Sequence, residues 1–320
     1  MEQRIAWNDL PRRVRDAIED RTGPITGVRI PGLGQNSPLA GIIDTSAGRA
    51  FVKGMPSDHR KVIAQEREAA VAPFVAGISS VLLWSFDLAG WSVLDYEYAA
   101  GRHADYTPGS PDLDRLVQLM TALTAISVPR NPGPFKPAED RWKGYVDDPA
   151  MARVFAGATL THSDWTTDNV LVSGHRAWLI DWAWPTLGAP WTDPAGWLLR
   201  LMASGGHTPR RPSSRQRAAN PAHIDLFAAA NVRLWDEIAS SSNSDWPAAM
   251  VQAAHDWHAY RHAVRWAAQE CQSAPARPRP PLASWPTVRR SGPSASPSAD
   301  QGACQGGRPA RWGTRRSRQL

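Results

Sequence analysis

The chain has 320 residues, 42% of them hydrophobic and 21% charged, which is enough to bury a sizeable core. Its two cysteines exclude a disulfide framework, and the absence of a long apolar run or an apolar N-terminal segment argues against a secreted or membrane-spanning protein and favours the cytoplasm. The formal charge of +6 would suggest nucleic acid, but residues 272–320 carry +8 and leave −2 on residues 1–271. We therefore expect no specific nucleic-acid binding and no membrane partner.

The first elements expected along the chain are a helix and then a small sheet. Residues 9–22 read as an amphipathic helix, with Asp9 as its cap and Pro11 in its first turn. From residue 25 the hydrophobic pattern changes, and strands are predicted at 27–30, 39–43, 50–53, 81–86 and 91–98. Together these strands predict an antiparallel sheet of about five strands.

A polar loop with Gly32 and Gly34 lies between the first two strands, and Lys53 ends the third. Glycines let backbone N–H groups approach phosphate oxygens closely, although a Gly-x-Gly alone is equally compatible with a plain turn. A lysine at the end of such a strand is what a nucleotide-dependent phosphotransferase needs to hold the α- and β-phosphates. Its position after the loop favours that reading over an ordinary exposed lysine.

A helix is predicted from Ser57 or Asp58 to about Ala72, before Pro73. It contains Glu66 and Glu68, which point about 200° apart around the helix axis, so only one of them can face inward. After the sheet the chain turns helical, with Asp112 as the expected cap of a helix at residues 113–126 and a short helical piece near 141–145.

The stretch at residues 160–185, LTHSDWTTDNVLVSGHRAWLIDWAWP, carries most of the functional signal. The apolar runs at 170–172 and 177–180 flank a Gly-containing turn and predict a β-hairpin, which would return Asp181 to the neighbourhood of Asn169. Carboxylate and amide oxygens suit Mg²⁺, which one or two carboxylates usually hold together with nucleotide phosphates. Asp164 has no cation in its sequence neighbourhood and is placed to accept the proton of an attacking hydroxyl.

Asp and Asn are also common at turns and caps, and we assign such a structural role to Asp168. A metal-hydrolase site is disfavoured because the chain has no His-Glu-x-x-His and no cysteine cluster. The joint pattern therefore favours phosphoryl transfer.

His162-Ser-Asp164-Trp-Thr-Thr-Asp-Asn169, followed by Leu-Ile-Asp181-Trp, resembles the catalytic and metal-binding loops of the aminoglycoside phosphotransferase family, relatives of the protein kinases. The resemblance implies that Asp164 is the catalytic base, that Asn169 and Asp181 bind Mg²⁺, and that His162 is structural. Ser163 stands where the family usually has glycine. A protein kinase would have an Arg before the catalytic Asp and Phe-Gly after the metal-binding Asp, so a small-molecule kinase is favoured.

The same resemblance implies that Lys53 pairs with a glutamate on the following helix. We select Glu68 because the separation of 15 residues is similar to that in the family, with Glu66 as the alternative. From their position before the Lys53 strand we expect Gly32 and Gly34 to lie near the nucleotide. The resemblance also implies that residues 96–98 form the hinge beside the adenine, and that an Asp at about position 193 braces the catalytic loop.

Beyond the catalytic stretch, Asp193 is the expected cap of a helix, residues 204–220 read as a mobile loop, and helices are predicted at 221–240 and 245–270. Acidic residues on these two helices would meet either a cationic acceptor or solvent; they are Asp225, Asp236, Glu237 and Asp256. Residues 272–320 are rich in Pro, Arg, Ser and Gly and are expected to be disordered.

We therefore expect an α+β, bilobal protein-kinase-like fold. Its parts are an N-terminal helix (1–22), a β-rich N-lobe (23–99), a helical C-lobe (100–271) and a basic tail (272–320). The expected reaction moves the γ-phosphate of ATP, with Mg²⁺, to a hydroxyl of a small molecule; GTP remains an alternative donor. Other readings are a non-catalytic kinase-fold nucleotide-binding protein and, less favoured, a protein kinase. The sequence indicates neither the acceptor nor the oligomeric state.

Overall fold

The computed structural model describes residues 4–31, 37–129, 133–174, 176–209, 219–243 and 245–273. The chain divides into two units, residues 1–273 and 274–320, and every described residue belongs to the first unit. From residue 274 on, the tail that we expect to be disordered lies outside the described residues, as does the centre of the loop at 204–220.

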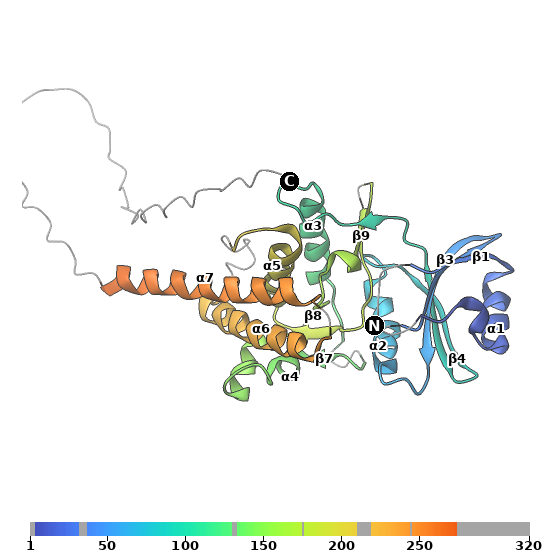
Figure 1. Cartoon of the computed structure of the whole chain (residues 1–320), viewed down its shortest axis with the longest axis horizontal. Coiled ribbons are helices and arrows are strands. Elements are labelled where there is room, and N and C mark those ends of the chain that lie inside the picture. Colours follow the sequence, from blue (N-terminus) through green and yellow to red (C-terminus); the bar gives the residue numbers. More distant parts are fainter. Residues whose placement is uncertain are drawn as a thin grey trace, which may run out of the picture. The chain divides into compact units, whose positions relative to one another are not determined.

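A five-stranded antiparallel sheet forms the first lobe (Figure 1). Its strand order is β1-β2-β3-β5-β4, and its strands are β1 (Ile25–Arg29), β2 (Leu39–Thr45), β3 (Gly48–Pro56), β4 (Leu82–Leu88) and β5 (Trp91–Glu97). The predicted antiparallel sheet of about five strands is confirmed.

The two faces of this sheet have different partners because side chains alternate along each strand. One face packs against helix α1 (Arg12–Thr22) in a hydrophobic cluster that includes Val14, Ile18, Leu39, Ile43, Val52 and Val93. The register pairs Ala40 with Lys53 and Ile42 with Phe51, so these four residues share the opposite face. That second face is the one that contributes to the site described below.

Helices α1 and α2 (Val62–Val75) both begin later than the sequence predicts. Asp9 lies in a short 3-10 turn, Trp7–Asp9, and does not cap α1; Pro11 occupies the N-cap position, and its carbonyl accepts the N–H groups of Val14 and Arg15. Helix α2 also continues through Pro73. Because Pro73 lies in the last turn, its missing N–H removes only one hydrogen bond near a helix end.

The second lobe is mainly helical. Its helices are α3 (Asp112–Thr124), α4 (Ala138–Trp142), α5 (Thr192–Gly205), α6 (Pro221–Ser241) and α7 (Ala248–Ser273), with 3-10 turns η2 (Pro149–Phe155) and η3 (Thr167–Asn169). Two three-stranded sheets lie among them. One has β10 (Arg176–Leu179), β9 (Val170–Ser173) and β6 (Arg102–His103), and the other has β7 (Lys136–Pro137), β11 (Thr186–Gly188) and β8 (Thr159–Thr161). The predicted α+β architecture is confirmed.

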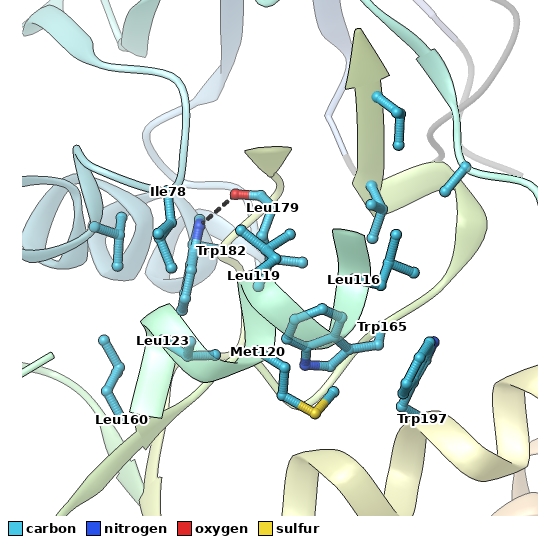
Figure 2. Close-up of a cluster of buried hydrophobic side chains, with 14 of the residues drawn as sticks. Ile78, Leu116, Leu119, Met120, Leu123, Leu160, Trp165, Leu179, Trp182 and Trp197 are labelled. Atoms are coloured by element: carbon cyan, nitrogen blue, oxygen red, sulfur yellow. Dashed lines mark hydrogen bonds between the residues drawn. The ribbon is translucent and has the colours of Figure 1, made fainter. Parts of the chain in front are cut away.

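One buried cluster lies directly beneath the predicted catalytic stretch (Figure 2). In it Trp182, the residue after Asp181, is 4% exposed and packs among Ile78, Leu119 and Leu123. The Trp182 indole N–H donates to the Leu179 carbonyl at 2.9 Å. The segment that carries Asp181 is therefore anchored in the hydrophobic core on its C-terminal side.

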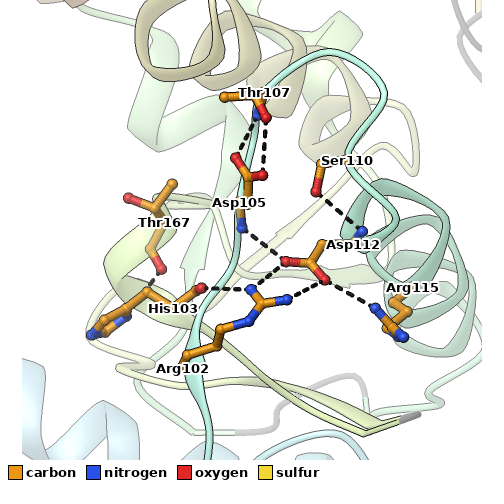
Figure 3. Close-up of polar contacts among 8 residues, drawn as sticks. All are labelled: Arg102, His103, Asp105, Thr107, Ser110, Asp112, Arg115 and Thr167. Carbon is orange, nitrogen blue, oxygen red and sulfur yellow. Dashed lines mark hydrogen bonds and ion pairs between the residues drawn. The ribbon is translucent and has the colours of Figure 1, made fainter.

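Polar contacts fix the segment that follows the first lobe (Figure 3). The Arg102 guanidinium donates to both carboxylate oxygens of Asp112, at 2.6 and 2.9 Å, and Asp112 also accepts from Arg115 and from the Asp105 backbone N–H. Asp112 is thus a first-turn residue of α3 whose buried carboxylate ties β6 to the helix, whereas we predicted it as the cap. Next to Arg102, His103 Nδ1 lies 3.3 Å from the Thr167 carbonyl of η3.

Within the described part of the chain, no helix combines the length and the apolar character needed to cross a bilayer.

Candidate active site

The predicted catalytic loop follows β8 in a strained turn. Ser163 has a φ of 68°, in the left-handed region that glycine favours. The Asp193 carboxylate holds this turn by accepting the backbone N–H groups of His162 at 2.8 Å and Ser163 at 2.9 Å. Asp193 belongs to the first turn of α5 and is not its N-cap, since its carboxylate serves the catalytic loop instead. This contact is the brace that the family resemblance implies.

His162 is fully buried and links two loops. Its Nδ1 accepts the Asp164 backbone N–H at 3.2 Å, so the other ring nitrogen, Nε2, carries the proton that is donated to the Ile180 carbonyl at 3.0 Å. The imidazole also packs edge-on against Trp182, with ring centroids 4.6 Å apart. His162 therefore fastens the loop of Asp164 to the segment of Asp181.

Two side chains hold the Asp164 carboxylate. The Asn169 amide nitrogen donates to Asp164 Oδ2 at 3.1 Å and to the Asp164 carbonyl at 3.0 Å. Arg200 Nη2, from α5, donates to Oδ1 at 2.6 Å. Asp164 has no cation in its sequence neighbourhood, but folding brings Arg200 to it from 36 residues away. The Arg200 guanidinium is itself held over the Trp235 ring at 4.9 Å.

Lys53 joins the two lobes. Its ammonium donates to Glu68 Oε1 at 2.6 Å and to Asp181 Oδ1 at 2.7 Å, and its side chain is 9% exposed. Glu66 is exposed, so the structure places Glu68 against the lysine and leaves Glu66 to solvent. Asp181 adopts a φ of 61°, a conformation that Asp tolerates better than most side chains. The β-hairpin β9–β10 and its register, with Leu179 opposite Val170, bring Asp181 back beside Asn169 as predicted.

Burial and neighbouring charge have opposite effects on the pKa values of Lys53, Glu68 and Asp181. Burial lowers the pKa of Lys53, but the two carboxylates outweigh it and raise the pKa above its ordinary value. Burial raises the pKa of Glu68 to about 7, against the opposing effect of the Lys53 ammonium. Burial also disfavours the charged form of Asp181, although 27% of its side chain is exposed, yet the adjacent ammonium keeps its pKa below the ordinary value. Lys53 is therefore charged at neutral pH, and Asp181 is its ionised partner.

A cavity opens between the sheet and the hairpin. Its walls include apolar side chains from both lobes, among them Ala40, Ile42, Phe51, Leu171, Ile180 and Trp182. Its polar side includes Lys53, Glu68, Asn169 and Asp181. Residues 96–99, where the resemblance implies a hinge, also line it. An apolar slot that ends in a few converging polar groups is typical of small-ligand sites.

The sequence prediction and the residues that line the cavity agree only in part. Gly32 and Gly34 fall outside the described residues, so their expected approach to phosphate stays a prediction. Asp164 is not among the described residues that line the cavity, whereas Asp168, which we read as structural, is. Arg4, which no sequence pattern indicates, lines the cavity as well.

The oxygen donors at the cavity fit a magnesium ion. The Asn169 amide nitrogen is directed to Asp164, which leaves the amide oxygen for another partner, and the Asp181 carboxylate lines the same cavity. No cluster of three or more His, Cys, Asp or Glu suited to a metal occurs in the part of the chain that the structure describes. One carboxylate and one amide oxygen are the sparse protein donor set that Mg²⁺ uses when phosphates complete its coordination.

Solved structures share this architecture. One is LicA, the choline kinase of Streptococcus pneumoniae, in a structure with bound AMP. It has 15% identity to this chain and a TM-score of 0.51, with 78% of this chain and 98% of LicA covered. The aminoglycoside phosphotransferase APH(4)-Ia has 13% identity and a TM-score of 0.51, with 76% and 98% covered. The chain has a kinase-like fold. The resemblance to the aminoglycoside phosphotransferase family is thereby confirmed at the level of the fold. No protein-family model and no curated protein sequence matches the chain.

Proposed function

We propose that this protein is a small-molecule kinase that transfers the γ-phosphoryl group of ATP, with Mg²⁺, to a hydroxyl group. The observation that carries the proposal is the convergence of Lys53 from the first lobe with Asp181 from the second, at 2.7 Å, beside Asn169 and the catalytic-loop residue Asp164. A phosphotransferase positions phosphates and neutralises their charge, and these groups supply a fixed cation and oxygen ligands for that purpose.

Each residue has a role in this proposal. Lys53 binds the phosphates and is held straight by Glu68. Asn169 and Asp181 would hold Mg²⁺, which on binding neutralises phosphate charge. The acceptor oxygen bonds to the γ-phosphorus as the bond to the ADP oxygen breaks, and Asp164 takes the hydroxyl proton. Both Asp164 oxygens already accept one hydrogen bond, but a carboxylate has about four acceptor sites, so a further proton donor can be accommodated.

The test is acceptor-dependent release of ADP from ATP and Mg²⁺, followed by mass spectrometry of the products, across amino alcohols, sugars and aminoglycosides. Asp164→Asn should lower kcat by at least 10²-fold, roughly the value of general-base catalysis, and leave ATP binding unchanged. Asp114→Asn, the same change on the exposed side of α3, is the matched control. ATP binding without transfer to any acceptor would favour the non-catalytic alternative. Full turnover by Asp164→Asn would contradict the assigned base.

A further inference from the structure

The polar side of the cavity carries more negative than positive charge. Among the described residues that line it, four are acidic, namely Glu68, Glu97, Asp168 and Asp181, and the Lys and Arg residues are Lys53 and Arg4. The Lys53 ammonium already donates to two of those carboxylates. A polyphosphate that enters this space therefore needs more positive charge than Lys53 supplies.

Arg4 comes from the segment that precedes the first lobe. Its Nη1 donates to the Ser37 carbonyl at 3.0 Å, and the next residue, Ile5, donates its backbone N–H to the Pro38 carbonyl at 2.9 Å. Ile5 also packs against the cluster between α1 and the sheet. The N-terminal segment is thus fastened along the start of β2, and Arg4 is held at the edge of the cavity.

Two further observations place Arg4 in a polar subsite. Ser37 also lines the cavity, and its side-chain oxygen is buried without a hydrogen-bond partner in a residue that is 3% exposed. A buried polar group without a partner costs free energy unless a ligand or water satisfies it. Burial lowers the pKa of Arg4 while the Asp181 carboxylate raises it, so the guanidinium lies within the electrostatic reach of the Asp181 carboxylate.

On the basis of the proposed function, we infer that Arg4 is a phosphate-binding residue that the N-terminal segment contributes to the nucleotide site. A guanidinium presents N–H groups in a planar fork that matches phosphate oxygens, and it stays charged even when partly buried. Arg4 then supplies the positive charge that Lys53, shared between Glu68 and Asp181, cannot supply alone. The segment before α1 is in this view part of the site as well as a packing element.

The experiment compares the binding of ATP, ADP and adenosine to the full chain and to Arg4→Ala by calorimetry in the presence of Mg²⁺. We expect Arg4→Ala to weaken ATP binding about ten- to hundredfold, which is the effect of a charge-assisted hydrogen bond, and to leave adenosine binding within about twofold of wild type. Arg4→Lys should recover part of the loss, because it restores the charge without the fork.

Arg12→Ala is the matched control, since it removes an exposed arginine from the start of α1 and should bind all three ligands as wild type does. Equal ATP affinity in Arg4→Ala and wild type would overturn the inference and leave the proposed function standing. Equal losses for ATP and adenosine would overturn it too, because they would mark a structural role. If wild type bound adenosine but not ATP, or bound neither, the result would contradict both the proposed function and the inference.

Discussion

Lys53 pairs with two carboxylates, and this arrangement fixes the position of its ammonium. A lysine side chain loses considerable rotamer entropy when it is ordered. Here that entropy is lost when the protein folds, so it need not be lost again when a ligand binds. Glu68 belongs to the first lobe and Asp181 to the second, so the Lys53 ammonium also links the two lobes. Removing one carboxylate should therefore affect nucleotide use more than it affects folding.

Glu68→Gln tests this directly, with Glu66→Gln as its control on the same helix. Glu68→Gln removes one of the two negative charges that fix the Lys53 ammonium, so we expect kcat/KM for ATP to fall by about ten- to hundredfold. Glu66 is exposed and its replacement should change kcat/KM by less than twofold. The measurement is steady-state kinetics with ATP varied. Similar effects of both substitutions on kcat/KM would contradict a role of the Lys53–Glu68 pair in the use of ATP.

Ser163 keeps a backbone conformation that suits glycine better. Its φ of 68° costs an L-residue about 1–2 kcal/mol, of which part is offset because glycine is more flexible in the unfolded chain. Ser163→Gly should therefore raise the free energy of unfolding by about 0.5–1 kcal/mol, measured by urea denaturation. Ser163→Ala retains the Cβ atom and the strain, so it should give no gain. A loss of stability in Ser163→Gly would show that the contact of the Ser163 hydroxyl with Thr161 Oγ1, at 3.3 Å, outweighs the strain.

At the scale of elements, the sequence predicts those parts of the site that depend on short spacing. The hairpin after Asn169 determines where Asp181 lies, and hydrophobic alternation with one short turn is enough to predict it. The 15 residues between Lys53 and Glu68 are likewise readable from a known pattern. Arg200 and Arg4 leave no such trace, because they reach the site through packing of α5 and of the N-terminal segment, 36 and 177 residues from their respective partners Asp164 and Asp181.

Helix boundaries show the same limit on prediction. Asp9, Asp112 and Asp193 all look like caps, since Asp is a favoured N-cap residue. In the structure Asp9 lies in a separate turn, Asp112 binds Arg102 and Arg115, and Asp193 binds the catalytic loop. A buried carboxylate with several donors gains more from them than from one cap bond, and sequence spacing does not reveal those donors.

Helices α4 and α5 also bear on the choice of acceptor, because they bring two arginines close to Asp164. Arg200 pairs with Asp164 directly, and the pKa of Arg141 is lowered by burial but raised by Asp164 and Asp193. Three of the four acidic residues that could meet a cationic acceptor have partners on α7: Asp225 pairs with Arg261 at 2.7 Å, Asp236 with His255 at 3.0 Å, and Asp256 accepts from Gln252 at 2.9 Å. Asp164 itself is thus already paired with a cation.

We therefore predict that uncharged or anionic alcohols are better acceptors than cationic alcohols. Choline and its uncharged analogue 3,3-dimethylbutan-1-ol have the same shape around the hydroxyl, so their ratio of kcat/KM isolates the effect of charge. We expect the uncharged alcohol to be favoured at least fivefold, about 1 kcal/mol, and Arg200→Ala to reduce that preference. Faster transfer to choline or to an aminoglycoside would contradict the prediction.

At the scale of the whole molecule, one buried carboxyl group couples the stability of the first lobe to pH. Asp95 lies on β5, is 0% exposed, and has no hydrogen-bond partner at either carboxylate oxygen. It alternates with Leu94 and Tyr96, and so lies on the face of the sheet that packs against α1, away from the cavity. Burial raises its pKa from 3.8 to about 7. The carboxyl group is therefore tolerated when it is protonated and costly when it is charged.

The sign of the pH effect follows from this shift. The pKa of Asp95 is higher in the folded protein than in the unfolded chain, so its contribution to stability is complete below about pH 3.8 and is lost as pH rises through about 7. Asp95→Asn cannot ionise, and we expect it to be more stable than wild type at pH 8 by about 1–3 kcal/mol, with the gain disappearing near pH 4. Urea denaturation at several pH values measures this difference. Asp87→Asn, an exposed change in the same sheet, should run parallel to wild type throughout. A constant difference between Asp95→Asn and wild type across this range would mean that Asp95 has an ordinary pKa, and that water or another group satisfies its carboxylate.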